Sequence, residues 1–159
     1  MVELMELDPE LLRPSGALLA AQIALSSAID EYAVQPIGHD PTTSDLLVRL
    51  HLAPDHALRA VELCAQLLKS PSHISRRIDR AEAAGLVRRD PDPDDRRARL
   101  VVLTDAGRDV VAQLAPRLVD VLDHAIFETL DASEIDTLVG LLARIEAGAR
   151  TCVVGADRP

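Results

Sequence analysis

The sequence has 159 residues, 48% of them hydrophobic, and a formal net charge of −9 at pH 7. This length suits one domain, or one domain with an intimate extension. Tyr32 and Phe127 are the only aromatic residues besides histidine, so the core must consist of leucine, valine, isoleucine and alanine, which suits helix-on-helix packing.

The same residues argue against several classes of protein. No apolar run approaches the roughly 18 residues needed to span a membrane, so we expect no membrane segment. The first ten residues include four acidic and no basic residues, whereas a secretory signal begins with basic ones. The two cysteines, Cys64 and Cys152, form no motif. We therefore expect a reduced, cytoplasmic protein.

The N-terminal third of the sequence predicts two helices. Residues 1–14 are acidic and contain proline, and we expect a short helix or a frayed arm there. From Ser15 to Val34 apolar residues recur at helical spacing and predict an amphipathic helix. Two prolines and a glycine in the run 35–41 should break it. The next helix should start with Thr42 or Thr43 as its N-cap.

A pair of helices separated by a tight turn is predicted next. The first should span Leu58 to Leu68, and the second Ser72 to about Ala84, where Gly85 ends it. Ser70 is a good N-cap residue, and Pro71 suits the first helical position, where its missing N–H costs nothing.

The second helix of this pair has an apolar and a polar face. Ile74, Ile78 and Ala81 are spaced i, i+4, i+7 and share one face. The side chains that they should meet on the preceding helix are Val61, Leu63 and Leu67. A helix with such a polar face can lie in a DNA major groove, with its N-terminal residues at base edges. The candidate DNA-binding residues here are Ser70, Pro71, Ser72, His73, Ser75, Arg76, Arg77 and Arg80.

A charged hairpin follows, in which Pro91 and Pro93 should make a stiff, turned tip between two strands. Asp95 and Arg97 are two residues apart and could brace the tip by an ion pair. The candidate residues for contact with phosphates or the minor groove are Arg96, Arg97 and Arg99. The alternative, favoured for an isolated charged hairpin, is an ordinary solvated surface loop.

The charge is unevenly distributed along the chain. Residues 69–99 contain nine basic and six acidic residues, a net charge of +3, and the remainder contains 8 basic and 20 acidic residues, a net charge of −12. A basic lobe on an acidic body is the pattern expected of a DNA-binding protein with a negative net charge.

The C-terminal third predicts two more apolar helices. Thr104 can cap the first, and Pro116 should kink or divide it. Asp131 or Ser133 should cap the last helix, in a capping-box arrangement. We expect the tail from Gly148 to be loose.

Residues 58–107 resemble the DNA-binding lobe of the MarR family of transcriptional regulators. The motifs that carry the resemblance are the helix pair, 62–67 and 70–87, and the D-x-R…L-T-x-x-G signature in 95–107. Two positions depart from the family pattern: Lys69, where an apolar residue or glycine is common, and Pro116, inside what should be a long helix.

The resemblance implies a mainly α fold, a winged helix-turn-helix with a two-stranded β-wing plus N- and C-terminal dimerisation helices. We divide the chain into an N-terminal arm and dimerisation helix, the DNA-binding lobe, the C-terminal dimerisation helices and a tail, at 1–42, 43–103, 104–150 and 151–159. In the family, the terminal helices of two protomers interdigitate into a homodimer. The alternative is a monomeric bundle that buries these apolar faces internally.

The resemblance further implies a sequence-specific regulator, most often a repressor, that binds a pseudo-palindrome in double-stranded DNA. A small, often aromatic or phenolic effector would release it. By resemblance the residues near the effector are Tyr32, His39, Arg49 and His51, and Arg49 would suit an anionic effector. Exposed or capping roles are the alternative for these four residues. The alternative function is a helix-turn-helix module that acts through a protein partner and binds DNA poorly.

No catalytic motif stands out in the sequence. It contains no HExxH, GxSxG, glycine-rich phosphate loop or CxxC. A metal site of His39, His51 and His56 is the alternative to ordinary surface histidines, and Cys64 is more often a small core residue than a redox switch. We therefore expect no enzymatic activity, no cofactor and no bound metal.

Overall fold

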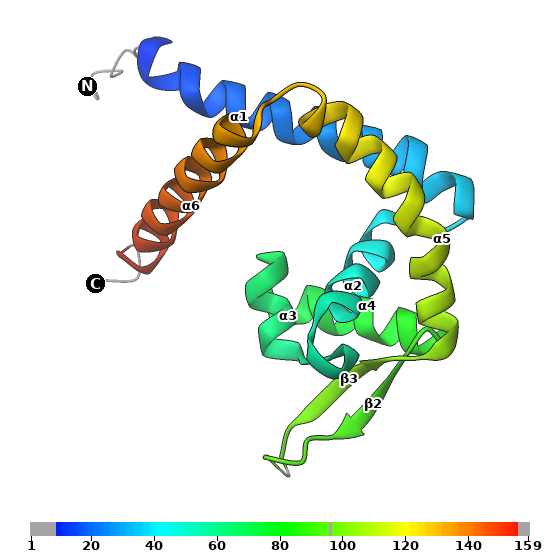
Figure 1. Cartoon of the computed structure of the whole chain (residues 1–159). Coiled ribbons are helices and arrows are strands. Elements are labelled where there is room, and N and C mark those ends of the chain that lie inside the picture. The colour runs from blue at the N-terminus through cyan, green and yellow to red at the C-terminus, as the bar shows by residue number, and fades with distance from the viewer. Residues whose placement is uncertain (1–8, 96, 156–159) are drawn as a thin grey trace, which may run out of the picture. The chain divides into compact units, whose positions relative to one another are not determined.

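The computed structural model describes residues 9–95 and 97–155, in two units that meet in sequence between Val119 and Asp120. The first unit contains a three-stranded sheet, four helices and most of a fifth, and the second contains the long C-terminal helix (Figure 1). The helices are α1 (Pro9–Ala28), α2 (Pro41–Leu52), α3 (Ala60–Leu67), α4 (Pro71–Ala83), α5 (Asp105–Leu122) and α6 (Ala132–Gly155). The strands are β1 (Ala57–Arg59), β2 (Val87–Pro91) and β3 (Arg99–Leu103).

The N-terminal helix is longer than predicted. It begins at Pro9 rather than Ser15 and continues from α1 into a π-helical turn, η1 (Ile29–Val34), and a 3-10 turn, η2 (Gln35–Ile37). The break predicted within 35–41 is confirmed. It occurs at Gly38, whose φ of 74° is readily adopted only by glycine.

The N-cap of α2 is Asp40, so the prediction of a threonine cap is wrong. The Thr43 N–H donates to Asp40 Oδ1 at 2.9 Å, and both threonine hydroxyls donate to the same carboxylate. Burial acts to raise the pKa of Asp40, but the hydrogen bonds from Thr42 and Thr43 outweigh it and lower the pKa to about 2. The threonines therefore serve as donors to a cap that lies before the helix.

The sheet has three antiparallel strands in the order β1–β3–β2, where the sequence predicted a two-stranded wing. The additional strand is β1, whose Leu58 lies opposite Val101 of β3. The prediction that a helix begins at Leu58 is therefore wrong, and α3 begins at Ala60. A three-residue strand is too short to show alternation in the sequence, and its partner is far away in the chain. A short 3-10 turn, η3 (Pro54–His56), leads into β1.

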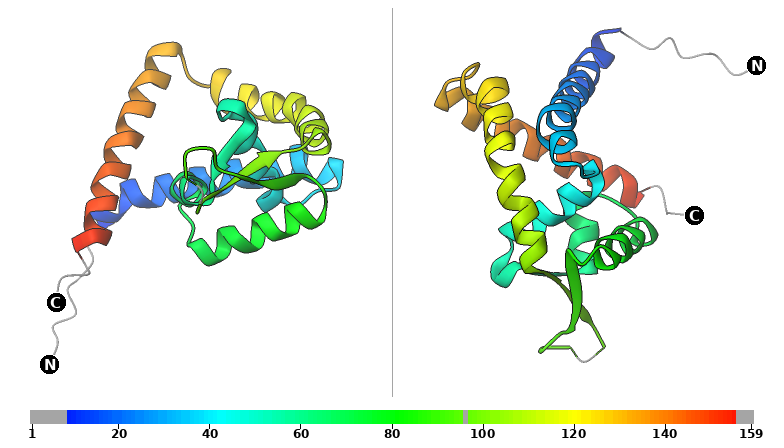
Figure 2. Two further views of the ribbon diagram at one scale, coloured as in Figure 1. Left: turned by 90° about the horizontal axis from the view of Figure 1, so that it is seen from below. Right: turned by 90° about the vertical axis from the view of Figure 1, so that its right-hand side faces the viewer.

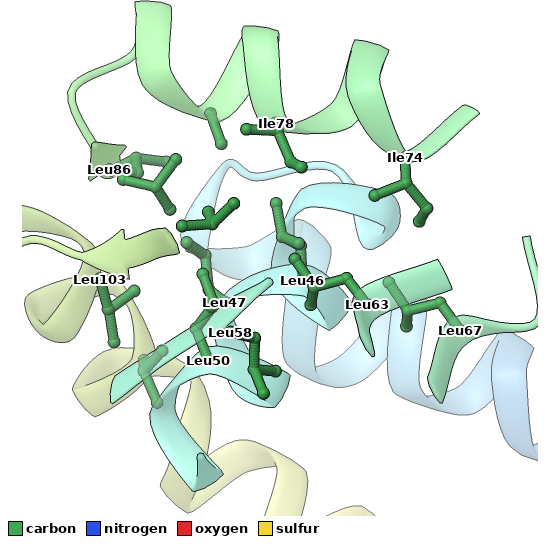
Figure 3. Packing of buried hydrophobic residues seen from close by; sticks show 14 of the residues in the cluster. Leu46, Leu47, Leu50, Leu58, Leu63, Leu67, Ile74, Ile78, Leu86 and Leu103 are labelled. Carbon is green, nitrogen blue, oxygen red and sulfur yellow. The ribbon is translucent and has the colours of Figure 1, made fainter. Parts of the chain in front are cut away.

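The core of the first unit forms where α4 packs on α2 and α3. Ile74 and Ile78 point from α4 toward leucines of these two helices (Figure 3). Ile74, Ile78 and Ala81 are buried, as predicted, and Gly85, with a φ of 73°, follows the end of α4. Burying one leucine or isoleucine contributes about 1.5–3 kcal/mol. The leucines of this contact are Leu46, Leu47, Leu50, Leu63 and Leu67.

Two predictions, one on the contact between α3 and α4 and one on the helix after the wing, need correction. Val61 does not pack on α4, because it is 69% exposed. Of the kink or division predicted at Pro116, the division is wrong, because α5 continues to Leu122. Pro116 is exposed, so water can satisfy the carbonyl that loses its partner. The start of α5 is as predicted, with the Gly107 N–H donating to Thr104 Oγ1 at 3.1 Å.

In the second unit, α6 has the predicted capping box. Asp131 Oδ1 accepts from the Ser133 and Glu134 N–H groups at 2.8 and 2.9 Å, and Glu134 Oε2 accepts from the Asp131 N–H at 2.9 Å. A short π-helical turn, η4 (Asp123–Phe127), lies between α5 and this cap. The tail predicted from Gly148 onward is wrong for residues 148–155, which belong to α6. Residues 156–159 lie outside the described chain.

Both terminal helices carry exposed apolar side chains. On α1, Leu19 is 59% and Ile23 61% exposed, and on α6, Val139 is 61% and Ile145 51% exposed. The segment Leu12–Ile37 is long and apolar enough to cross a membrane, with a mean hydropathy of 1.2, and 11% of its apolar window is buried. The expectation that no segment approaches a membrane span is therefore wrong. Length and composition alone do not distinguish a membrane span from a helix that meets another protein chain.

Gly107 supplies a test of the packing between α5 and the sheet. A Cβ at this position would lie 2.2 Å from the Leu86 carbonyl oxygen and 2.6 Å from Leu103 Cδ1. We predict that Gly107→Ala lowers the free energy of unfolding by about 1–3 kcal/mol, measured by chemical denaturation. Gly16→Ala is the control, since a Cβ there meets nothing within 4 Å, and it should stabilise the helix by about 0.5–1 kcal/mol. Equal stability of the two variants would contradict this close approach.

Candidate nucleic-acid interface

The N-terminus of α4 is open to a ligand. Ser70 stands at the N-cap position, but its hydroxyl lies 3.1 Å from Ser72 Oγ and makes no capping hydrogen bond to the helix backbone. The predicted cap is therefore formed by the backbone alone, and Pro71 occupies the first turn as predicted. Backbone N–H groups of the first turn remain available to an acceptor such as a phosphate oxygen.

The exposed face of α4 is polar and basic. Arg77 is half-buried between this face and the core. Both views in Figure 2 place α4 at the outside of the first unit, and the β2–β3 hairpin projects from the helices beside it. The predicted residues that are exposed on α4 are Pro71, Ser72, His73, Ser75, Arg76 and Arg80. The structure therefore brings the predicted α4 residues onto one surface.

Ion pairs separate the basic residues of this region into two groups. The arginines of β2 are paired, Arg88 with Asp90 at 2.9 Å and Arg89 with Asp79 at 2.6 Å. Among the described residues of 69–99, the basic side chains without a carboxylate partner are Lys69, Arg76, Arg77, Arg80, Arg97 and Arg99. The cations that remain available to an external anion are thus those of α4, its preceding turn and the wing.

Arg89 ties the base of the wing to the back of α4, a role that the sequence did not indicate. Its guanidinium pairs with Asp79 and Glu82, and its backbone N–H donates to Glu82 Oε1 at 3.1 Å. The hydrogen bond to Asp79 is the main cause that raises the pKa of Arg89. This network holds the wing at one angle to α4. A ligand that binds α4 therefore meets the wing in a single orientation.

The tip of the wing is braced by Arg59 and Asp92. Arg59 Nε donates to Asp92 Oδ2 at 2.5 Å, and the Asp92 side chain is 2% exposed. Asp92 Oδ1 also accepts from the Asp94 N–H at 2.9 Å. The hydrogen bond from Arg59 is the main cause that lowers the pKa of Asp92. No local pattern links two residues that lie 33 positions apart, so the sequence could not reveal this brace.

The predicted brace between Asp95 and Arg97 takes a different form. The Arg97 backbone N–H donates to Asp95 Oδ1 at 2.9 Å, which closes the turn, and the guanidinium makes no ion pair with Asp95. The Arg97 side chain is exposed and remains available. Arg96, a predicted contact residue, lies outside the described residues.

A cavity of about 370 Å³ lies behind this surface, lined by α1, η1, α2 and α5. Of the four predicted effector residues, Arg49 lines it, and it pairs with Asp45 at 3.5 Å. The other three do not line this cavity. Tyr32 is 62% exposed, and His51 stacks on His56 with ring centroids 5.3 Å apart. Of the four residues, this cavity therefore includes only Arg49, and the role of all four in binding an effector stays a prediction.

The remaining candidates for chemistry are isolated. Cys64 is a free thiol, half-buried against the core of the first unit, which agrees with a packing role. The side chain of Cys152 is not among those described. Within the described chain, no three histidine, cysteine, aspartate or glutamate side chains are grouped as ligands for a metal ion.

Comparisons with known proteins agree with this geometry. The sequence model of the MarR family matches residues 37–98. Sco3205 of Streptomyces coelicolor, a MarR family transcriptional regulator solved in complex with DNA, is 28% identical, with a TM-score of 0.79 over 89% of each chain. AbsC of the same organism, also a MarR family transcriptional regulator, is 26% identical, with a TM-score of 0.81 over 91% of this chain and 97% of that one. A MarR variant from E. coli, complexed with operator DNA, is 25% identical, with a TM-score of 0.73 over 86% and 95%.

The Arg59–Asp92 brace predicts how the wing responds to substitution and pH. Arg59→Gln should speed hydrogen exchange of the Asp94 and Ala98 amides several-fold, and adding Asp92→Asn should have little further effect, because the pair acts as a unit. Because the pKa of Asp92 is lowered, the brace should persist at neutral pH and be lost only as pH falls through that lowered pKa.

The control for this prediction is Arg88→Gln, which removes an ion pair between two exposed side chains at the base of the wing. Such a pair contributes little, so the exchange of the tip amides should not change. Additive effects of Arg59→Gln and Asp92→Asn would contradict the direct pairing.

Proposed function

Because the chain belongs to the MarR family of winged helix-turn-helix transcriptional regulators, we propose that it binds a pseudo-palindromic operator as a homodimer, represses transcription and is released by a small effector. The observation that carries this proposal is the set of cations without ion pairs among the described residues of α4 and the wing, beside an α4 N-terminus whose N–H groups are open. A site of this kind acts in the cytoplasm, where the chromosome lies.

The division of labour within the proposed interface follows from geometry. Arg76 lies in the first half of α4, on the face opposite Ile74 and Ile78, where a helix in the major groove meets base edges. Arg97 lies at the wing tip, where it can meet the phosphate backbone or the minor groove. The DNA complexes of Sco3205 and of E. coli MarR support the same use of this fold.

The homodimer is supported by the apolar surface of the terminal helices. On α1 and on α6, each considered by itself, leucine, isoleucine and valine side chains remain exposed. Exposed apolar faces of this extent mark contacts with other protein chains. Two copies related by a two-fold axis would present two α4 helices to successive major grooves, which gives the contact area that specific binding requires.

The alternative of a protein-interaction module that binds DNA poorly has no comparable support. A module of that kind does not need unpaired arginines on the face of α4. Absence of DNA binding in the test below would favour this alternative.

The first test is a gel shift with the intergenic DNA upstream of the protein's own gene, since such regulators often control adjacent genes. Arg76→Ala should weaken specific binding by roughly 1–3 kcal/mol per half-site and relax the base preference at one position. Arg97→Ala should weaken binding to all sequences and reduce the slope of log K against log salt by about 1 per protomer.

The matched control is Arg117→Ala, which removes an exposed arginine of α5 that lies outside α4 and the wing. It should leave the affinity within about twofold of the unsubstituted protein, because charges beyond a Debye length are largely screened. Equal losses of affinity in Arg117→Ala and Arg97→Ala would show that Arg97 acts only through the overall charge of the protein, and would contradict a wing contact with DNA.

A second test addresses the homodimer. Ile23→Asp should convert the protein to a monomer in analytical ultracentrifugation and weaken operator binding at least tenfold, because it places a charge on the proposed interface. Leu52→Asp is the control, since Leu52 is 74% exposed at the end of α2, and it should remain dimeric. A monomeric unsubstituted protein, or a dimeric Ile23→Asp variant, would refute the proposed assembly.

A further inference from the structure

We propose that the cavity behind α4 takes a small, largely apolar ligand that carries a cationic amine, held by the Asp30 carboxylate and the Ser44 hydroxyl. The proposal specifies the chemistry of the effector and so rests on the proposed function. The cavity lies wholly within the first unit and is lined by the end of α1, η1, α2 and α5.

The walls of the cavity suit an apolar body. Its volume of about 370 Å³ lies in the range of small-molecule sites, roughly 300–1,000 Å³. The apolar side chains on its walls come from three elements, so a ligand would contact more than one helix. They are Ile29, Val34, Val48, Leu114 and Leu118. Burial of apolar surface against them would supply most of the binding energy.

Two of the residues that line this cavity each carry a buried polar atom without a partner. Among the described residues, Ser44 Oγ and Asp30 Oδ1 are the buried side-chain polar atoms without a hydrogen bond, and both residues line the cavity. Ser44 is 2% exposed. Asp30 Oδ2 accepts from Gln35 Nε2 at 3.3 Å, so the second oxygen of the same carboxylate remains free. A buried polar atom without a partner costs free energy, which a ligand that donates hydrogen bonds would recover.

The charges of the cavity favour a cation over an anion. The charged residues that line it are Asp30, Asp45 and Arg49. Arg49 pairs with Asp45 in the same helix, so its charge is already compensated. The charge without an opposite partner is that of Asp30. An ammonium group offers N–H donors to both the Asp30 carboxylate and the Ser44 oxygen. A carboxylate could accept only from the Ser44 hydroxyl and would be repelled by the negative charge of Asp30. The anionic effector that the sequence suggested is therefore disfavoured.

The position of α2 connects this cavity to α4. Ser44 and Val48 line the cavity, whereas Leu46, Leu47 and Leu50 of the same helix pack in the core with Ile74 and Ile78 of α4. A ligand that shifts α2 would therefore displace the helix proposed to read DNA. Such a ligand changes DNA affinity only through its difference in affinity for the two positions of α2.

The experiment compares three probes of similar size and different charge by isothermal titration calorimetry on the full chain: 2-phenylethylamine, 2-phenylethanol and phenylacetate. We expect the amine to bind at least about tenfold more tightly than the alcohol, and phenylacetate to bind most weakly. Asp30→Asn should weaken amine binding at least about tenfold and change alcohol binding little. Val48→Phe, which fills the cavity, should abolish binding of all three.

Two further variants serve as controls. Glu31→Gln removes the same charge from the adjacent residue of η1, which is exposed and does not line the cavity, and it should leave amine binding unchanged. Asp45→Asn frees Arg49 and should strengthen phenylacetate binding. Circular dichroism confirms that each variant is folded before titration.

Three results would overturn the proposal: tighter binding of phenylacetate than of the amine, equal losses in Asp30→Asn and Glu31→Gln, or no binding of any probe at millimolar concentration. The gel shift without ligand is measured separately. Loss of the ligand result with intact DNA binding rejects only the amine site, and absence of DNA binding with intact amine binding rejects only the proposed regulator.

Discussion

The packing of α4 on α2 and α3 is the contact on which the rest of the first unit depends. Ile74 and Ile78 are buried against leucines of both helices, and this burial turns the polar face of α4 outward. The same leucine-bearing helix, α2, forms a wall of the cavity with its other face. The helix α2 thus contacts both α4, which carries the proposed DNA-binding surface, and the proposed effector site. A displacement of α2 at the effector site would therefore act directly on α4.

Ion pairs with carboxylates within the protein determine which arginines remain available to bind an external anion. Arg88 and Arg89 of β2 are neutralised within the protein, and the pairing of Arg89 with Asp79 and Glu82 ties the base of the wing to α4. The arginines of α4 and the wing tip have no such partners among the described residues. Counting basic residues in the sequence therefore overstates the charge available to DNA, and the structure divides them into those that hold the interface together and those that can contact phosphate.

Local signals in the sequence predicted much of the fold. Pro71 and Gly85 bounded α4 correctly because proline and glycine act on the backbone at their own positions. The errors arose where a choice depends on distant residues. β1 exists because β3 pairs with it, and the tip of the wing is braced by Arg59 and Asp92 rather than by neighbours. Among the site residues, the exposed face of α4 followed from helical periodicity, whereas the cavity-lining Ser44 had no signal because its lack of a partner is visible only in three dimensions.

The long-range brace has a consequence for protein engineering. Regulators of this fold invite chimeras in which the hairpin tip of one protein is transplanted onto another to alter groove contacts. In this chain the tip is not an independent cassette, because the buried carboxylate of Asp92 relies on a guanidinium supplied by β1. A graft of residues 92–97 into a scaffold without an arginine at the position of Arg59 would bury an uncompensated charge. The smallest transplantable unit is therefore the hairpin together with its third strand.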